Sequence, residues 1–278
     1  AYYAHEYATA PAPVSTADLV VGVTQSGETA DTLSALREAS RRGAETLALT
    51  NVVGSTAARE ADHVLYIRAG PEIGVAATKT FSSQLVGVNL LAAHLTDRNE
   101  RRRDFVDDLR GIANDVQAVL DESMAQAVVE EFLDADAFFF LGRGLDYPVA
   151  LEGALKFKEI TYDHAEGFSA AELKHGPLAL VTDQTPVFAV FTGRNDTKTL
   201  HNVKEVRARD APVVAVAADG YREVDDYADH VLRVPDTHHD VAGILANVQL
   251  QLVSYLAADE LSRPIDKPRN LAKSVTVE

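Results

Sequence analysis

The chain has 278 residues, of which 46% are hydrophobic and none is cysteine, and its formal net charge is −16. This length suffices for one large or two small domains, and the lack of cysteine excludes disulfides, thiolate metal sites and cysteine nucleophiles and fits a cytoplasmic location. So acidic a surface repels nucleic acid and anionic lipid, no apolar run of about 18 residues predicts a membrane span, and no basic-then-apolar leader indicates secretion.

The first predicted elements are buried strands that alternate with helices. A strand is predicted at Leu19–Val23, a helix near Asp31–Arg42, and strands at Thr46–Leu49 and His63–Ile67. Short apolar runs that alternate with amphipathic helices are typical of a parallel sheet with helices on both faces. A charged segment with helical rhythm, Asp97–Met124, is then predicted to connect two lobes.

The second half of the chain repeats this order. Ala61–Leu65 reads ADHVL and recurs as Ala228–Leu232, at an offset of 167 residues that also aligns the surrounding apolar pattern. The second copy is predicted to contain strands at Ala137–Leu141, Pro186–Phe191, Pro212–Ala217 and His230–Val234, with helices at Pro148–Tyr162 and Thr197–Arg209. We infer a duplication that produced two α/β lobes.

The same offset predicts where the lobes differ. The counterparts of the strand at 137–141 and the helix at 148–162 would precede residue 1, so the first lobe is expected to lack its opening strand and helix. Tyr3–Ala8 would match a short helix at Ala170–His175. We therefore predict a first lobe at 1–110, a connecting helix and second lobe at 111–258, and an irregular tail at 259–278.

The segment Thr24-Gln25-Ser26-Gly27-Glu28-Thr29 lies between the first strand and the first helix. The N–H groups at a helix start attract anions, and three hydroxyls within six residues favour a small phosphate ester. An ordinary N-cap explains serine and threonine at this place about equally well. No Walker lysine or G-x-G-x-x-G pattern is present, so nucleotide binding is not favoured.

Acid–base residues cluster in the second half. Glu152, Lys156 and Glu159 lie on one face of a predicted helix, where a solvated stripe of ion pairs is the simpler explanation. His175 is predicted at a helix end, and Lys273 lies on the tail; a histidine can shuttle protons near neutrality.

His238-His239, with Asp236 and Asp240, could suggest a metal cluster, but a loop at a strand end explains the pattern as well. We predict no metal.

Five segments resemble one family. These are Val23–Leu33 (VTQSGETADTL), Glu72–Ala76 (EIGVA), Leu151–Ile160 (LEGALKFKEI), Glu172–Leu178 (ELKHGPL) and Pro268–Glu278 (PRNLAKSVTVE). They are similar to the isomerase domains of the glutamine–fructose-6-phosphate aminotransferases, or glucosamine-6-phosphate synthases. The resemblance implies two SIS lobes, each a flavodoxin-like parallel sheet with helices on both faces, in a cytoplasmic homodimer.

The resemblance also implies a reaction: fructose 6-phosphate and ammonia, which the full enzyme takes from glutamine, become glucosamine 6-phosphate without a cofactor. It places the sugar phosphate on Thr24, Gln25, Ser26 and Thr29, and it has Val75 and Ala272 line the sugar. It makes Glu159 the base between C1 and C2, Lys156 the cation that stabilises the enol-like intermediate, His175 the ring-opening group, given by the neighbouring subunit, and Lys273 the lysine that engages the open-chain ketose.

Departures leave alternatives. Thr24 stands where the family usually has serine, and Ala77 where bacterial relatives often have serine. The family's Cys-Gly-Thr-Ser phosphate turn and its glutaminase domain are not in this sequence. A stand-alone SIS phosphosugar isomerase or deaminase and a non-catalytic SIS sensor of sugar phosphates are the other hypotheses.

Overall fold

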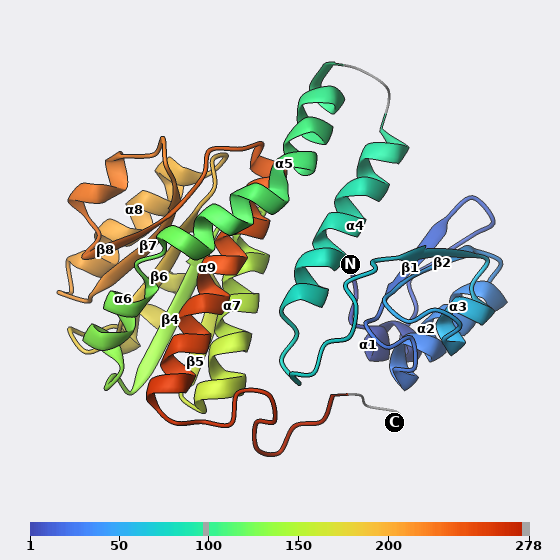
Figure 1. Ribbon diagram of the computed structural model, residues 1–278, viewed down its shortest axis with the longest axis horizontal. Helices are drawn as coiled ribbons and strands as arrows, with labels where there is room; N and C mark the ends of the chain where they lie inside the picture. Colours follow the sequence, from blue (N-terminus) through green and yellow to red (C-terminus); the bar gives the residue numbers. More distant parts are fainter. Residues whose placement is uncertain (97–99, 274–278) are drawn as a thin grey trace. The chain divides into compact units, whose positions relative to one another are not determined.

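A computed structural model of the chain describes residues 1–96 and 100–273. These residues form two compact units: unit 1 contains Ala1–Ala92 and the tail from Asn270, and unit 2 contains Ala93–Arg269. Each unit is built on a parallel sheet of its own, with three strands in unit 1 and five in unit 2 (Figure 1). The lobe boundaries predicted near residues 110 and 258, and the missing opening elements, stay predictions.

Unit 1 follows the predicted order of elements. They are α1 (Ala4–Thr9), β1 (Leu19–Val23), α2 (Ala30–Arg41), β2 (Glu45–Thr50), α3 (Thr56–Glu60), β3 (His63–Tyr66) and α4 (Lys79–Leu95). The sheet order is β1-β2-β3. Leu36 of α2 and Ala57 of α3 pack with Ala48 on one face. On the other face Gly87 of α4 lies so close to Leu49 that a Cβ there would be 3.1 Å from the leucine side chain.

Unit 2 contains every strand predicted for the second copy and further elements. They are α5 (Glu100–Glu122), α6 (Ala125–Phe132), β4 (Ala137–Gly142), α7 (Asp146–Thr161), β5 (His164–Ser169), η1 (Glu172–His175), η2 (Pro177–Leu180), β6 (Val187–Phe191), α8 (Asp196–Arg207), β7 (Val213–Ala218), η3 (Glu223–Asp226), β8 (His230–Val234) and α9 (His239–Glu260). The sheet order is β5-β4-β6-β7-β8. The helix expected at Ala170–His175 is only the 3₁₀ turn η1, and strand β5 and helices α4 and α9 were not predicted.

Alternate residues of the unit 2 strands build two separate cores. Phe138, Phe140 and Phe188 point to the face covered by α6, α7 and α9. Phe139 and Phe191 point to the opposite face, which α8 and the η1–η2 segment cover. Since successive side chains of a strand point to opposite faces, apolar strands such as VFAVF require a helix layer on each side. The expected fold class, a parallel sheet with helices on both faces, is confirmed (Figure 1).

The internal repeat is present in the strand pairing itself. Val20 pairs with Thr46 in unit 1, and Val187 pairs with Val213 in unit 2, so both partners are shifted by the same 167 residues. The registers of β2–β3 and of β7–β8 are related by this offset too. The two sheets therefore share their hydrogen-bond ladder and not only their apolar composition.

The aspartate of the repeated ADHVL motif has the same task in each unit. The carboxylate of Asp62 accepts hydrogen bonds from the amide of Thr46, at 2.9 Å, and from its hydroxyl, at 2.8 Å. Asp229 accepts from the amide of Val213 at 2.7 Å and from the guanidinium of Arg207 at 2.7 Å. Each aspartate thus satisfies a backbone donor at the start of the neighbouring strand.

One described helix, α9, is long and apolar enough to cross a membrane by length and composition alone. The eighteen-residue window that meets this criterion is 72% buried inside the protein. Leu245, Leu250 and Val253 of α9 belong to the same apolar cluster as strands β4 and β6. The packing is that of a core helix of unit 2.

We predict that Asp229→Ala destabilises unit 2 by about 1–3 kcal/mol, because the buried residue Val213 loses the acceptor for its amide. The measurement is the free energy of unfolding in urea. Asp183→Ala, which removes an exposed acid of the same unit, is the control and should change it by less than about 0.5 kcal/mol. Equal losses for the two variants would mean that the repeated aspartate has no structural task.

Candidate functional site

The predicted phosphate cradle, Thr24–Thr29, begins where β1 ends and leads into α2. Its backbone is fixed to the neighbouring strand, because the amide of Thr24 donates to the carbonyl of Leu49 at 3.0 Å and the carbonyl of Gln25 accepts from the amide of Asn51 at 3.1 Å. The carboxyl ends of parallel strands meet at one edge of the sheet, and ligands of α/β proteins bind there. The cradle thus occupies the edge at which this fold binds ligands.

Gly27 has to be glycine for two reasons. Its φ is +71°, in the left-handed region, and a Cβ at this position would lie 2.1 Å from Oγ of Ser55. Its carbonyl also accepts a hydrogen bond from the amide of Ala57 at the start of α3. The turn is therefore packed closely between β1 and α3.

Two hydroxyls of the cradle lie close together. Oγ1 of Thr24 lies 3.3 Å from Oγ1 of Thr29 and accepts from the amide of Gly27 at 3.2 Å. Thr29 occupies the N-cap position of α2, yet its side chain makes no capping hydrogen bond. Oγ of Ser26 accepts from the amide of Glu28, and the carboxylate of Glu28 accepts from the amide of Thr56 of α3 at 2.8 Å. The hydroxyls can therefore serve an anion, while the acid of the motif is engaged elsewhere.

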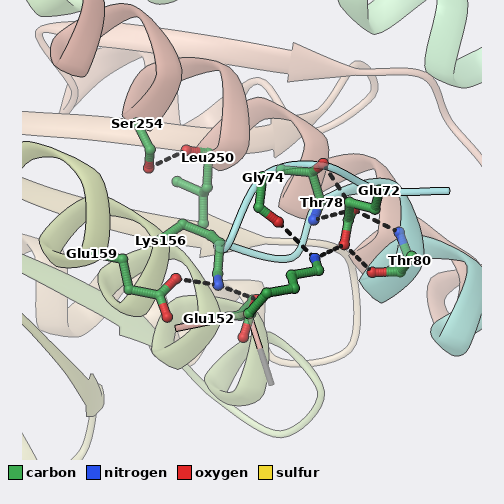
Figure 2. Close-up of polar contacts among 10 residues, drawn as sticks. Glu72, Gly74, Thr78, Thr80, Glu152, Lys156, Glu159, Leu250 and Ser254 are labelled. Atoms are coloured by element: carbon green, nitrogen blue, oxygen red, sulfur yellow. Dashed lines mark hydrogen bonds and ion pairs between the residues drawn. The ribbon is translucent and has the colours of Figure 1, made fainter. Parts of the chain in front are cut away.

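A second feature of unit 1 is an ion pair between loop and tail. Nζ of Lys273 donates to the carboxylate of Glu72 at 2.8 Å and to the carbonyl of Gly74 at 2.6 Å. Figure 2 shows Glu72 among Gly74, Thr78 and Thr80. Among the other predicted contacts of unit 1, Val75 is half-buried in this loop and Ala272 is exposed on the tail. Residues 274–278 of the tail motif lie outside the part of the chain that the structure describes.

Glu72 is charged although its side chain is only 5% exposed. Burial alone would raise the pKa of its carboxyl group. Hydrogen bonds from Lys273, from the hydroxyl of Thr80 and from the amides of Thr78 and Thr80 outweigh this effect and lower the pKa to about 2. Glu72 belongs to the segment EIGVA, and its position in the sequence alone predicts no role for it.

In unit 2, helix α7 presents a buried charge cluster. Lys156 is 4% exposed, its Nζ contacts the carboxylate of Glu159, and it lies 3.6 Å from the carboxylate of Glu152 (Figure 2). Burial raises the pKa of Glu152 to about 7, although the charge of Lys156 opposes this shift. The solvated stripe that spacing alone suggested is wrong for these residues. A lysine shared by two half-desolvated carboxylates is an arrangement suited to proton transfer.

His175 ends the 3₁₀ turn η1, and its side chain is exposed. Gly176 follows with φ of +148°, which glycine adopts readily. The structure thus groups Thr24, Ser26 and Thr29 in unit 1, and Lys156 with Glu159 in unit 2.

Unit 2 has a counterpart of the cradle at Thr192–Asp196, but the N–H and O–H donors of this loop already bond to carboxylates of the chain. Asp146 accepts from the hydroxyl and amide of Thr192, and Asp196 accepts from the amide of Gly193 at 2.9 Å. Burial raises the pKa of Asp146 to about 7 and raises that of Asp196 as well. Asp146 borders a cavity of about 210 Å³ that Arg143 also lines. The donors of this loop are thus engaged by carboxylates of the chain itself.

The side chains of His238, His239 and Asp240 offer atoms within 4.8 Å of one another. His238 is the N-cap of α9, and its Nδ1 accepts from the amide of Asp240. The guanidinium of Arg194 lies 3.6 Å from the carboxylate of Asp240. These contacts are those of a capped helix start, and the absence of a metal stays a prediction.

The fold and these residues define an α/β protein of two parallel-sheet units, with a candidate ligand site at the carboxyl edge of the first sheet. A family model described as "SIS domain" matches residues 1–94 and 131–259, and the chain belongs to this family.

Within it, the chain is the counterpart of one particular domain. The solved C-terminal domain of glucosamine-fructose-6-phosphate aminotransferase from Francisella tularensis is 36% identical, with a TM-score of 0.87, over 95% of this chain and 77% of that domain. The glutamine–fructose-6-phosphate aminotransferase of Halobacterium salinarum is 56% identical over 94% of this chain and 44% of its own length. The solved glucosamine-6-phosphate deaminase of Thermotoga maritima is 26% identical, with a TM-score of 0.78, and 80% of it is covered. The chain thus spans less than half the length of the aminotransferases.

The raised pKa of Asp146 makes a prediction about stability. Between the ordinary pKa of 3.8 and about 7 the folded state retains a proton that the unfolded chain has released, so this contribution to stability is lost as pH rises through 7. Asp146→Asn cannot titrate. Its free energy of unfolding should therefore rise relative to the wild type by roughly 2 kcal/mol between pH 5 and pH 8.

The measurement is urea unfolding at both pH values. The control Asp183→Asn removes an exposed carboxylate and should follow the wild type. Parallel pH profiles for the wild type and Asp146→Asn would contradict the prediction.

Proposed function

We propose that the chain is the isomerase half of a glucosamine-6-phosphate synthase, which converts fructose 6-phosphate and ammonia to glucosamine 6-phosphate. The observation that carries this proposal is the buried Lys156 of α7 in its ion pair with the half-buried Glu159. A binding module has no need of a buried lysine between two carboxylates, whereas a proton transfer next to a carbonyl needs a desolvated base and a cation. The names of the relatives point to the same reaction.

In this proposal the phosphate is the handle of the substrate. Thr24 and Thr29 offer hydroxyls that lie side by side at the start of α2, and Ser26 adds a third hydroxyl in the same turn; the helix dipole favours an anion there. Gln25 adds an amide to this phosphate site, and Val75 and Ala272 line the sugar. The binding energy of the phosphate would hold C1 and C2 in place for the chemical step.

The reacting groups follow from the residue types. His175 opens the sugar ring by proton transfer, and Lys273 engages the open-chain ketose. Glu159 takes the proton from C1 and returns it to C2, and Lys156 stabilises the negative charge that develops on the enol-like intermediate. These steps require no metal and no organic cofactor.

The remaining parts of the reaction need more than this chain. Since the aminotransferases are more than twice as long, we propose that a glutaminase domain on the same polypeptide supplies the ammonia. We also propose a cytoplasmic homodimer. The exposed side chain of His175 supports this assembly, because such a histidine can reach the site of a second copy.

One observation favours a second candidate, a stand-alone SIS isomerase or deaminase of phosphosugars. The solved deaminase of Thermotoga maritima shares the fold over 98% of this chain. Such an enzyme would act on glucosamine 6-phosphate and release ammonia without any response to glutamine. Product formation that depends on glutamine in the full-length protein distinguishes the two.

We predict that replacing Ser26 and Thr29 together with alanine weakens binding of glucosamine 6-phosphate by roughly 1–3 kcal/mol, the range for lost hydrogen bonds to a charged group. Calorimetry on the full-length protein measures this. Ser40→Ala, which removes an exposed hydroxyl near the other end of α2, is the matched control and should leave the affinity unchanged. Unchanged affinity in the double variant would remove the cradle from the substrate site.

We predict that Glu159→Gln lowers turnover at least about 100-fold while the sugar phosphate still binds, because the amide keeps the shape and cannot accept the proton. The assay is the isomerisation of fructose 6-phosphate by the full-length protein. Glu166→Gln changes a glutamate of strand β5 in the same way and should retain activity. Near-normal turnover of Glu159→Gln would show that this residue belongs only to an ion-pair cluster.

A further inference from the structure

The carboxylate of Glu72 accepts hydrogen bonds from several groups of unit 1. Its Oε1 accepts from the amide of Thr78 at 2.9 Å, from the hydroxyl of Thr78 at 3.2 Å and from the amide of Thr80 at 3.2 Å. Its Oε2 accepts from the hydroxyl of Thr80 at 2.5 Å. Four donors at the start of α4 therefore fix the carboxylate without any contribution from the tail (Figure 2).

The tail adds the fifth donor. Nζ of Lys273 contacts Oε2 of Glu72 and the carbonyl of Gly74, although lysine and glutamate are 201 residues apart in the sequence. A carboxylate and a carbonyl that face one ammonium group leave that group little rotational freedom. Since the donors of α4 already hold Glu72, the lysine meets a negative charge that is in place before the tail arrives.

The position of this contact relates it to the cradle. Glu72 lies in the loop that follows β3, and the cradle follows β1 of the same parallel sheet. Both segments therefore leave the sheet at its carboxyl edge. The contact therefore holds the tail lysine at the sheet edge that also carries the cradle hydroxyls.

We propose that Glu72 is the positioning residue of the tail lysine: it docks the ammonium group of Lys273 at the cradle edge of unit 1. This inference rests on the proposed function, in which Lys273 engages the open-chain sugar. A lysine in this ion pair is charged and hydrogen-bonded, so it must leave Glu72 before its nitrogen can attack a carbonyl. Glu72 thus sets the position of the lysine before the reaction and takes no part in the chemical step.

The first test is the titration of Glu72 in the 278-residue chain, followed by carbon-13 NMR of its carboxyl group. In the wild type the signal should not titrate above pH 3. Lys273→Met removes one of the groups that lower the pKa of Glu72, so the carboxyl should titrate above pH 3, with its affinity for the proton increased at least about tenfold. The matched control is Lys267→Met, the same change at an exposed lysine six residues earlier, which should titrate as the wild type does.

The second test observes the lysine. Glu72→Gln keeps the shape and the acceptor oxygen but removes the charge, so Lys273 should react at least about fivefold faster with an amine-acetylating reagent at constant pH. Mass spectrometry of the tail peptide measures this rate, and Lys267 in the same sample is the internal reference. Far-UV circular dichroism verifies that the variant is folded. Should Glu72→Gln not fold, the Lys273→Met titration still decides, because a substitution on the tail spares the packing around Glu72.

An unchanged titration of Glu72 in Lys273→Met, or equal acetylation of Lys273 in the wild type and a folded Glu72→Gln, would overturn the docking. Neither measurement involves a sugar phosphate or turnover. If both measurements show the docking but the full-length protein shows no turnover that depends on Glu159, the proposed function is wrong and the docking remains. If turnover depends on Glu159 but the two measurements show no docking, the docking is wrong and the proposed function remains.

Discussion

Parallel strand pairing brings the carboxyl ends of all strands of a sheet to one edge, and the loops that carry the cradle, Glu72 and Thr192 depend on that constraint. In unit 1 the cradle follows β1, and the loop with Glu72 follows β3. In unit 2 the loop at Thr192 follows β6 in the same manner. Because the two sheets share their register at one offset, the duplication copied the edge together with the strands.

The chain treats its buried carboxylates in two opposite ways, and the number of donors decides between them. Five donors surround Glu72, so its pKa falls to about 2 in spite of burial. Glu152 shares a single lysine with Glu159, and its pKa rises to about 7. A carboxylate of the first kind holds a charge in position, whereas one of the second kind can exchange a proton near neutral pH. Positioning and proton transfer are thus assigned to different environments.

The sequence predicted the strands of both lobes within one or two residues, because apolar runs such as VFAVF and VVAVAA have no other stable environment than a covered parallel sheet. Strand β5, with the sequence HAEGFS, was missed because an edge strand of polar residues has no apolar pattern. Helix α9 was missed because it is apolar on nearly all sides and so lacks the amphipathic period. The burial of Lys156 and the partner of Glu72 depend on packing and on contacts between distant segments, which spacing along the chain does not contain.

The two aspartates at the second-lobe loop have a consequence for duplicated binding folds. Asp146 and Asp196 offer their oxygens to the donors of Thr192 and Gly193, as an anionic ligand would. They are, in effect, ligands tethered to their own receptor. A tethered group is present at an effective concentration of millimolar or above. A free anion therefore displaces it only at a comparable or higher concentration. A lobe can thus lose its ligand and keep its loop geometry, because its own carboxylates accept the hydrogen bonds that a bound anion would otherwise accept.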